Sequence, residues 1–227
     1  SVEKAAAPAI TTAYHLFLAE VEAKRGHLSV SRHQSQLAAS LLERFPNAWL
    51  RGLLDLHESC LCYLSGDFAS ALRLAREALA ASSRSGHQQT KVIALVDMAA
   101  AYLAVGQSAR AEVCISVGLS LTRPDEVMYG LLLETLAEAQ LICRNAPGCR
   151  ESLERARTIA SSLAQTRSSW SRTWNLRTEL RLLQREGLWN ESLRLIREAQ
   201  EKGLSPAVSF ATVQVRILEA LAVMRIQ

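Results

Sequence analysis

Histidine and cysteine are the side chains of this chain that could bind a metal ion or act as nucleophile and base. His57 lies three residues before Cys60, so one face of a helix would carry both side chains. That pair suggests a metal site or an activated thiol. Cys62 lies two residues after Cys60 and would point away from it, and no third ligand is in register. We therefore expect packing roles for these residues.

The remaining histidines and cysteines are scattered along the chain. The sequence contains five of each type, at His15, His27, His33, His57 and His87, and at Cys60, Cys62, Cys114, Cys143 and Cys149. The cysteines form no CxxC pair, which favours free thiols over a zinc site or a disulfide framework. We also find no HExxH, GxSxG, DDxxD or glycine-rich phosphate loop. The sequence therefore predicts a protein that is not an enzyme and has no cofactor or metal.

Composition and charge limit the fold and the partners. Of the 227 residues, 49% are hydrophobic, and no stretch alternates with the period of a strand, so an all-α fold is expected. Residues 1–143 carry 12 Lys and Arg against 14 Asp and Glu, whereas residues 144–227 carry 14 against 8. A basic C-terminal third could meet an acidic partner or nucleic acid. A solvated, arginine-rich helix surface is the other interpretation, and we favour it.

Targeting signals and membrane spans are absent from the sequence. The longest apolar run, residues 92–105, is interrupted by Asp97 and is too short to cross a bilayer. The chain begins with Ser1 and has no signal-peptide pattern. We expect a cytoplasmic location, no membrane contact, and a fragment of a larger protein.

A repeated helical hairpin organises the chain. Residues 64–79, LSGDFASALRLAREAL, read as a Gly–Asp turn followed by a helix with a stripe of small and apolar side chains. Similar turns are expected at Gly26, Gly66, Gly106, about Pro147, and Gly187, a spacing of forty residues. We expect the first helix to open at Pro8, and a last helix to run from Ala207 to about Met224. A regular period of this length is typical of a helical solenoid.

The hairpins resemble tetratricopeptide repeats. In MAAAYLAVGQSARAEVCISVGLSL, small residues and a tyrosine precede the turn glycine, and small residues follow it, at the family's spacing. The matching residues are Met98, Ala99, Tyr102, Gly106, Ala111 and Gly118, and the second unit matches at Gly66, Phe68, Ala71, Leu72 and Ala78. Two departures are a period of forty instead of thirty-four and the loss of the proline that ends standard repeats.

The resemblance implies a fold and a class of function. It implies a right-handed superhelix of about eleven antiparallel helices in one domain, residues 1–227. The repeats would span residues 8–46, 47–86, 87–123, 124–166 and 167–204, followed by a helix over residues 205–227. Long, degenerate repeats of this kind resemble sensor segments of bacterial signalling proteins, including LuxR-type and enhancer-binding transcription regulators. We therefore expect a non-catalytic scaffold for protein binding in signal transduction or transcription regulation.

The first helices of the hairpins would line a concave groove in this family. Polar residues on those helices are the candidate groove residues: Glu20, Asp55, Glu58, Asp97, Glu134, Glu138, Arg177 and Arg181. The six acidic residues would favour a basic or mixed-charge peptide, and Arg177 and Arg181 would hold its acidic end. The alternative is that all eight are solvated charges on helix surfaces.

Other interpretations stay open. Residues 185–210 resemble a pentatricopeptide repeat, which makes an RNA-binding helical-repeat protein the alternative function, although we do not expect nucleic acid to bind this domain. Self-association through apolar end helices is a further possibility. We expect contacts between tryptophan rings to hold two hairpins together, or else an exposed docking patch, at Trp170, Trp174 and Trp189.

Overall fold

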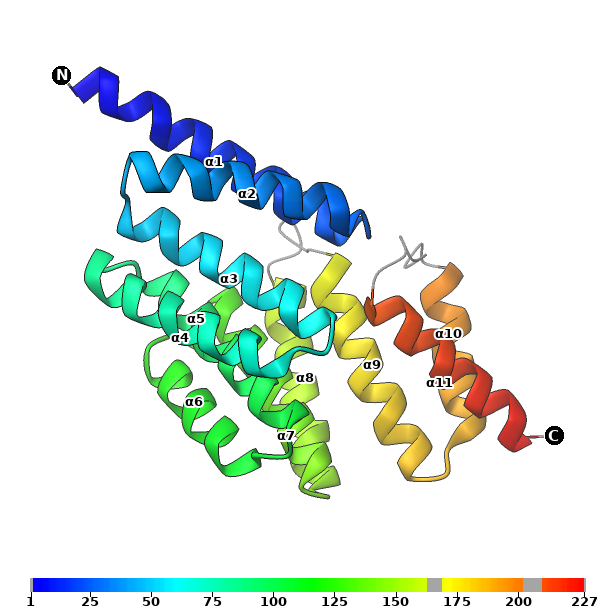
Figure 1. Ribbon diagram of the computed structural model, residues 1–227. Helices are drawn as coiled ribbons and strands as arrows, with labels where there is room; N and C mark the ends of the chain where they lie inside the picture. The colour runs from blue at the N-terminus through cyan, green and yellow to red at the C-terminus, as the bar shows by residue number, and fades with distance from the viewer. Residues whose placement is uncertain (1, 163–168, 202–209, 227) are drawn as a thin grey trace. The chain divides into compact units, whose positions relative to one another are not determined.

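The chain folds into α-helices alone in the parts that the structure describes. The computed structural model describes residues 2–162, 169–201 and 210–226, and these contain eleven helices and no strand (Figure 1). The predicted all-α class and the number of helices are confirmed. The right-handed superhelix stays a prediction.

The helices group into two compact units, which we describe one at a time. The first unit, Ser1–Arg123, contains the helices α1 to α6, and the second unit, Pro124–Gln227, contains α7 to α11. Bounds in the first unit are α1 Val2–Lys24, α2 Leu28–Arg44, α3 Ala48–Leu64, α4 Phe68–Ser85, α5 Gln88–Ala104 and α6 Ser108–Ser120. Bounds in the second unit are α7 Val127–Ile142, α8 Ala146–Ser162, α9 Ser169–Arg185, α10 Trp189–Glu201 and α11 Phe210–Ile226. The single domain inferred from the sequence stays a prediction.

The first unit has a strict period of twenty residues for each helix. The residue before each of its last five helices recurs at that interval, at His27, Asn47, Asp67, His87 and Gln107. Asn47, Asp67 and His87 accept hydrogen bonds from backbone N–H groups of the first turn, which caps their helices. Two such steps make one hairpin, which explains the spacing of forty between the turn glycines Gly26, Gly66 and Gly106.

Small residues let the helices of the first unit pack closely. Helix α3 packs against α1, α2, α4 and α5, so the odd-numbered helices contact one another as well as their hairpin partners. Helix α4 buries a row of alanines, at Ala71, Ala75, Ala78 and Ala81. A methyl group placed on Gly52 would stand 3.3 Å from the Thr90 methyl carbon and 3.4 Å from the Ala81 methyl carbon. Small residues therefore allow α3 to approach its neighbours closely at this point.

The period breaks in the second unit, and the fourth turn was predicted in the wrong place. The backbone turns at Arg144, which has a positive φ of 62°, and not at Pro147. Pro147 lies in the first turn of α8, where a proline costs no helical hydrogen bond. The Asn145 side chain caps that helix by accepting a bond of 3.1 Å from the Gly148 N–H. The turns of this unit therefore do not follow the forty-residue spacing.

The two terminal helices also differ from expectation. Helix α1 begins at Val2 and contains Pro8 in its interior, so Pro8 does not open it. Helix α11 begins at Phe210 and ends at Ile226, whereas the predicted start at Ala207 lies outside the described residues.

Packing in the second unit centres on α9. Helix α7 packs against α8 and α9, and α9 also contacts α10 and α11. One core cluster joins α7, α8 and α9 through Ala137, Leu141, Cys149, Leu153 and Leu182. A second cluster joins α9 and α10 through Leu176, Leu180, Ile196 and Ala199, and Val215 and Leu218 of α11 pack against it. Helix α9 therefore contributes to both apolar clusters of this unit.

Candidate functional site

One surface of the first unit repeats the same four positions on three helices. On α5 the four positions lie three or four residues apart, so their side chains line up on one side of the helix. Residues forty and eighty positions earlier occupy the equivalent places on α3 and α1. All twelve are partly or fully exposed, and we call them the odd-helix face: Ala13, Phe17, Glu20 and Lys24 on α1, Leu53, His57, Cys60 and Leu64 on α3, and Ile93, Asp97, Ala100 and Ala104 on α5.

Electrostatic effects show that polar groups of the three helices lie near one another on this face. Burial raises the pKa of the Cys60 thiol to about 12, and the carboxylates of Asp97 and Glu20 add to that rise. Lys24 opposes it, and the Lys24 ammonium also forms an ion pair with Glu20 one turn away. Cys60 therefore stays a protonated thiol between an acidic group of α1 and one of α5.

Asp97 is the acidic group of this face that has no compensating partner. Its side chain is partly exposed, and no hydrogen bond or ion pair joins its carboxylate to another described residue. Burial raises the pKa of Asp97 to about 7 and is the only cause of the shift. An unpaired carboxyl with a perturbed pKa on an accessible surface is a candidate binding group.

His57 is held by a hydrogen bond that leaves no activated nucleophile. The buried Ser31 hydroxyl donates to the Ala19 carbonyl over 2.8 Å, and its oxygen lies 2.9 Å from Nε2 of His57. Because the hydroxyl proton is already used, His57 must donate its Nε2 proton to Ser31. Burial, the main cause, lowers the pKa of His57, which favours this neutral imidazole. The imidazole fixes α3 to α2 and does not deprotonate the serine.

Metal-binding and thiol chemistry find little support in the described residues. Within them, no group of three or more His, Cys, Asp or Glu side chains could hold a metal ion. The five cysteines are free thiols. Burial also raises the pKa of Cys149 to about 11, so this thiol is protonated near neutral pH.

The four candidate groove residues of the first unit do not share one surface. Glu20 and Asp97 lie on the odd-helix face. Asp55 is only 7% exposed, and burial raises its pKa to about 6, with Arg51 opposing the shift and Glu77 of α4 adding to it. Glu58 is partly exposed on another side of α3, where its carboxylate acts on the Cys62 thiol. The structure therefore places two of these four candidates, Glu20 and Asp97, on the same surface.

Sequence reasoning did not include Phe17 among the candidate groove residues, and it gave His57 and Cys60 packing roles only. All three are at positions equivalent to Asp97 or Glu20 when the chain is aligned on its forty-residue period. The period was recognised from the turns, but it was not used to align the helix positions between them. That alignment is the signal that could have found these residues.

The four candidates of the second unit form a network between α7 and α9. Glu138 accepts from both Arg177, which is 3% exposed, and Arg181, whose Nη1 lies 3.0 Å from Oε1 of Glu138. Glu134 accepts a bond of 2.7 Å from the Asn175 side-chain amide. Both guanidinium groups are thus engaged by a carboxylate of their own unit. Their role in holding an acidic peptide end stays a prediction.

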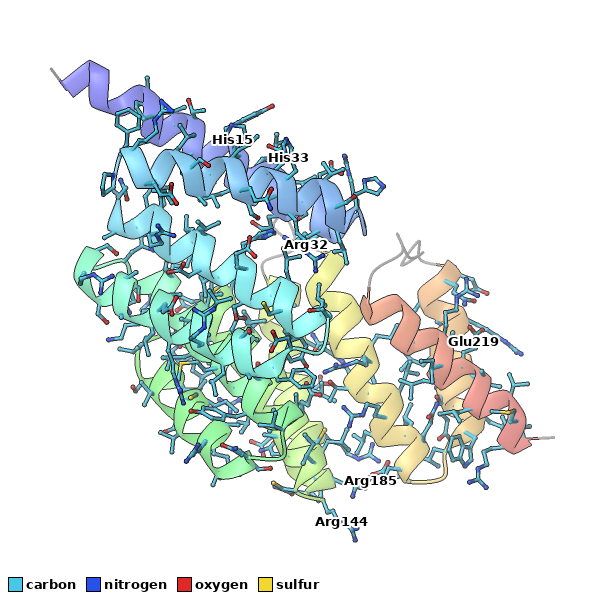
Figure 2. All side chains as sticks on the ribbon, viewed as in Figure 1. His15, Arg32, His33, Arg144, Arg185 and Glu219 are labelled. Atoms are coloured by element: carbon cyan, nitrogen blue, oxygen red, sulfur yellow. The ribbon has the colours of Figure 1, made fainter. Side chains whose placement is uncertain are left out.

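Other arginines of the second unit are also engaged. Figure 2 labels Arg144 at the turn after α7 and Arg185 at the end of α9, and the Arg185 guanidinium donates to the Leu141 carbonyl. Further ion pairs join Arg150 to Glu186, Arg157 to Glu179 at 2.5 Å, and Arg194 to Glu198 at 3.1 Å. These pairs favour the interpretation of the basic C-terminal third as a helix surface with compensated charge.

Two further features lie in the second unit. A pocket of about 520 Å³ lies between α10 and the end of α11, and its lining carries both signs of charge, from Arg194, Arg197, Glu198 and Glu201. The Arg225 guanidinium lies 6.0 Å from the ring centre of Trp189. The side chains of Trp170 and Trp174 lie outside the described residues, so the tryptophan contact stays a prediction.

Comparisons with known proteins do not assign the chain to a family. No protein-family model matches it, and no curated protein matches it. The tetratricopeptide resemblance therefore stays a prediction from the residues. Every helix in the described residues is too short or too polar to cross a lipid bilayer.

Proposed function

We propose that this protein is a non-catalytic helical-repeat module that binds a peptide, or an extended segment of a protein, along the odd-helix face. The supporting observation is the alignment of four positions on α1, α3 and α5 at intervals of forty residues. Repeated helices offer side chains at regular spacing along a surface, which suits an extended chain better than a compact small molecule. The resemblance to sensor segments of bacterial regulators adds a regulatory role to the proposal.

The chemistry of the face supports a mixed apolar and polar ligand. Leu53 and Ile93 are partly exposed at its first position, whereas Ala100 and Ala104 leave space at the third and fourth positions. Asp97 supplies a carboxylate that its own unit does not satisfy. Apolar contact area with a few polar groups that fix orientation is the usual composition of a binding surface.

Binding of defined peptide mixtures tests the proposal. Fluorescein-labelled decapeptide pools, each with one fixed central residue and all amino acids at the other positions, are titrated with the protein and followed by anisotropy. Ala100→Tyr places a bulky neutral side chain on the odd-helix face. Ala109→Tyr makes the same change at an exposed alanine of α6, away from the face. Circular dichroism melting curves verify that both variants fold.

The expected result is saturable binding by the wild-type chain, at least tenfold weaker binding by Ala100→Tyr, and unchanged binding by Ala109→Tyr. Equal effects of the two substitutions, or no binding of any pool, would overturn the proposal. A fluorescent U20 oligonucleotide at low salt serves as the third probe. Tight, salt-sensitive RNA binding that Ala100→Tyr leaves unchanged would replace the proposal with the RNA-binding alternative.

A further inference from the structure

We propose that Asp97 is the anchor that holds a lysine or arginine side chain of the peptide bound to the odd-helix face. This inference rests on the proposed function and specifies the chemistry of the ligand.

The position of Asp97 fits an anchor. It lies in the middle of the accessible stripe of α5, between Ile93 one turn before it and Ala100 one turn after it. Cys60 of α3 is close enough for the Asp97 carboxylate to raise the pKa of its thiol. These neighbours are apolar or small, so a long side chain can reach the carboxylate along them. A lysine or arginine stem is itself apolar and matches such a surface.

The missing partner is a cation. The other carboxylate of the face, on Glu20, already has the Lys24 ammonium within its own helix. Asp97 has no hydrogen bond or ion pair with any described residue. A carboxylate that is partly removed from water and unpaired is unfavourable, and it gains from a charge-assisted hydrogen bond. An ammonium or guanidinium group from a ligand supplies that bond, whereas a neutral or acidic ligand does not.

The surrounding groups leave Asp97 as the group that titrates on binding. On α3, Cys60 keeps its proton because its pKa is raised to about 12. Burial lowers the pKa of His57, which favours the neutral imidazole. On α1, Glu20 and Lys24 are paired with each other. No charged group of α4 or α6, the other neighbours of α5, contributes to the pKa of Asp97, which burial alone raises to about 7.

A dependence on pH follows. Only the ionised form of Asp97 binds a cation, and its fraction rises from roughly a tenth at pH 6 to roughly nine tenths at pH 8. The affinity for a peptide with a central lysine therefore rises about tenfold over this range. A peptide with a central glutamine has no such dependence, which separates this effect from general changes of the protein with pH.

The experiment uses four peptide pools whose fixed central residue is Lys, Arg, Gln or Glu. At pH 8 the wild-type chain is expected to bind the Lys and Arg pools at least tenfold more tightly than the Gln pool. Asp97→Asn is expected to remove this preference and to retain binding of the Gln pool. Glu112→Gln makes the matched change at an exposed residue of α6 and should behave as the wild type. Carbon-13 NMR of the Asp97 carboxyl should show its pKa falling when the Lys pool is bound.

The outcomes separate the inference from the proposed function. Equal binding of the Lys and Gln pools by the wild type, with no effect of Asp97→Asn, would overturn the anchor while peptide binding stands. A preference that disappears in Glu20→Gln and persists in Asp97→Asn would overturn it too, because the anchor would then be Glu20. Absence of binding by all four pools would overturn the proposed function together with the anchor.

Discussion

The two units of this protein treat acidic side chains in opposite ways. In the second unit, Glu138 is buried on α7 and receives two guanidinium groups from α9. In the first unit, Asp55 on α3 and Asp97 on α5 also lie on helices. Burial raises the pKa of each of these carboxyl groups well above its ordinary value. Burial of a charge is costly unless an opposite charge compensates it. The comparison shows that the second unit pairs a buried acid with guanidinium groups of a neighbouring helix, whereas the first unit leaves Asp97 without such a pair among the described residues.

A different set of contacts holds the first unit together. Its helices pack closely on the alanines of α4, and side-chain caps such as Asn47 stabilise the first turns of individual helices. The second unit instead uses ion pairs between α7 and α9 and between α8 and α9. Removal of a charge should therefore destabilise one unit and stabilise the other.

The largest effect is expected from removing the acid of the paired network. Glu138→Ala leaves the buried Arg177 guanidinium without its carboxylate, and we expect unfolding free energy to fall by about 3–5 kcal/mol. Urea denaturation at pH 7 measures the change. The exposed pair of Arg155 and Glu151, 4.0 Å apart, provides the control, because Glu151→Ala should cost less than about 0.5 kcal/mol. Equal costs for the two substitutions would remove the contrast between the units.

Asp97→Asn should raise the free energy of unfolding instead of lowering it, and the size of this gain should depend on pH. The folded pKa of Asp97 is about 7, whereas its ordinary value is 3.8, so between these values the folded state binds more protons than the unfolded state. Stability is therefore lost as pH rises, by about 3 kcal/mol between pH 5 and pH 8 for this group. The variant cannot ionise, so its stability relative to wild type should rise by that amount over the same range. Urea curves at pH 5 and pH 8 test this, and a constant difference would contradict it.

Arg144→Gly sharpens the comparison at the turns. The first unit places glycine at its positive-φ turn positions, whereas the second unit has Arg144 with φ of 62° after α7. Removing the β-carbon relieves this conformation, and we expect a gain of about 0.5–1 kcal/mol. Arg144→Ala keeps the β-carbon and should give no gain in a thermal melt. A gain from both substitutions would point to the charge of Arg144 and not to its backbone.

The smallest effect is expected at the last cap of the first unit. Gln107 precedes α6 at the position that Asn47 and Asp67 occupy before α3 and α4, but its side chain makes no cap bond. Gln107→Asp restores a capping side chain and should stabilise the chain by about 0.5 kcal/mol. Gln107→Ala is the matched control and should be neutral in the same urea measurement. Equal stability of the two variants would show that the period no longer sets the cap geometry at α6.

Local signals predicted most of the fold. The turns at Gly26, Gly66 and Gly106 were predicted correctly, because a turn glycine depends on its neighbouring residues. The fourth turn was misplaced because Pro147 and Gly148 resemble turn residues, although proline also fits the first turn of a helix. Arg144 gave no signal, since arginine is not typical of a positive-φ position.

The candidate site was only partly predictable. Asp55 and Asp97 were grouped together because both are acidic residues on first helices of hairpins. Their positions differ by forty-two residues, not by forty, so they point to different sides of their helices. Aligning the positions by the repeat period would have separated them.

The sequence by itself determined the helices, their period in the first unit and the small residues at their contacts, because these follow from propensity and spacing within a few turns of chain. Tertiary structure decided which charges meet. Glu138 and Arg177 are thirty-nine residues apart, and only the packing of α9 on α7 brings them into contact. Among the residues that the structure describes, the same kind of packing brings no cation into an ion pair with Asp97. A charge is compensated or left unpaired by residues distant in sequence, and no local pattern records that choice.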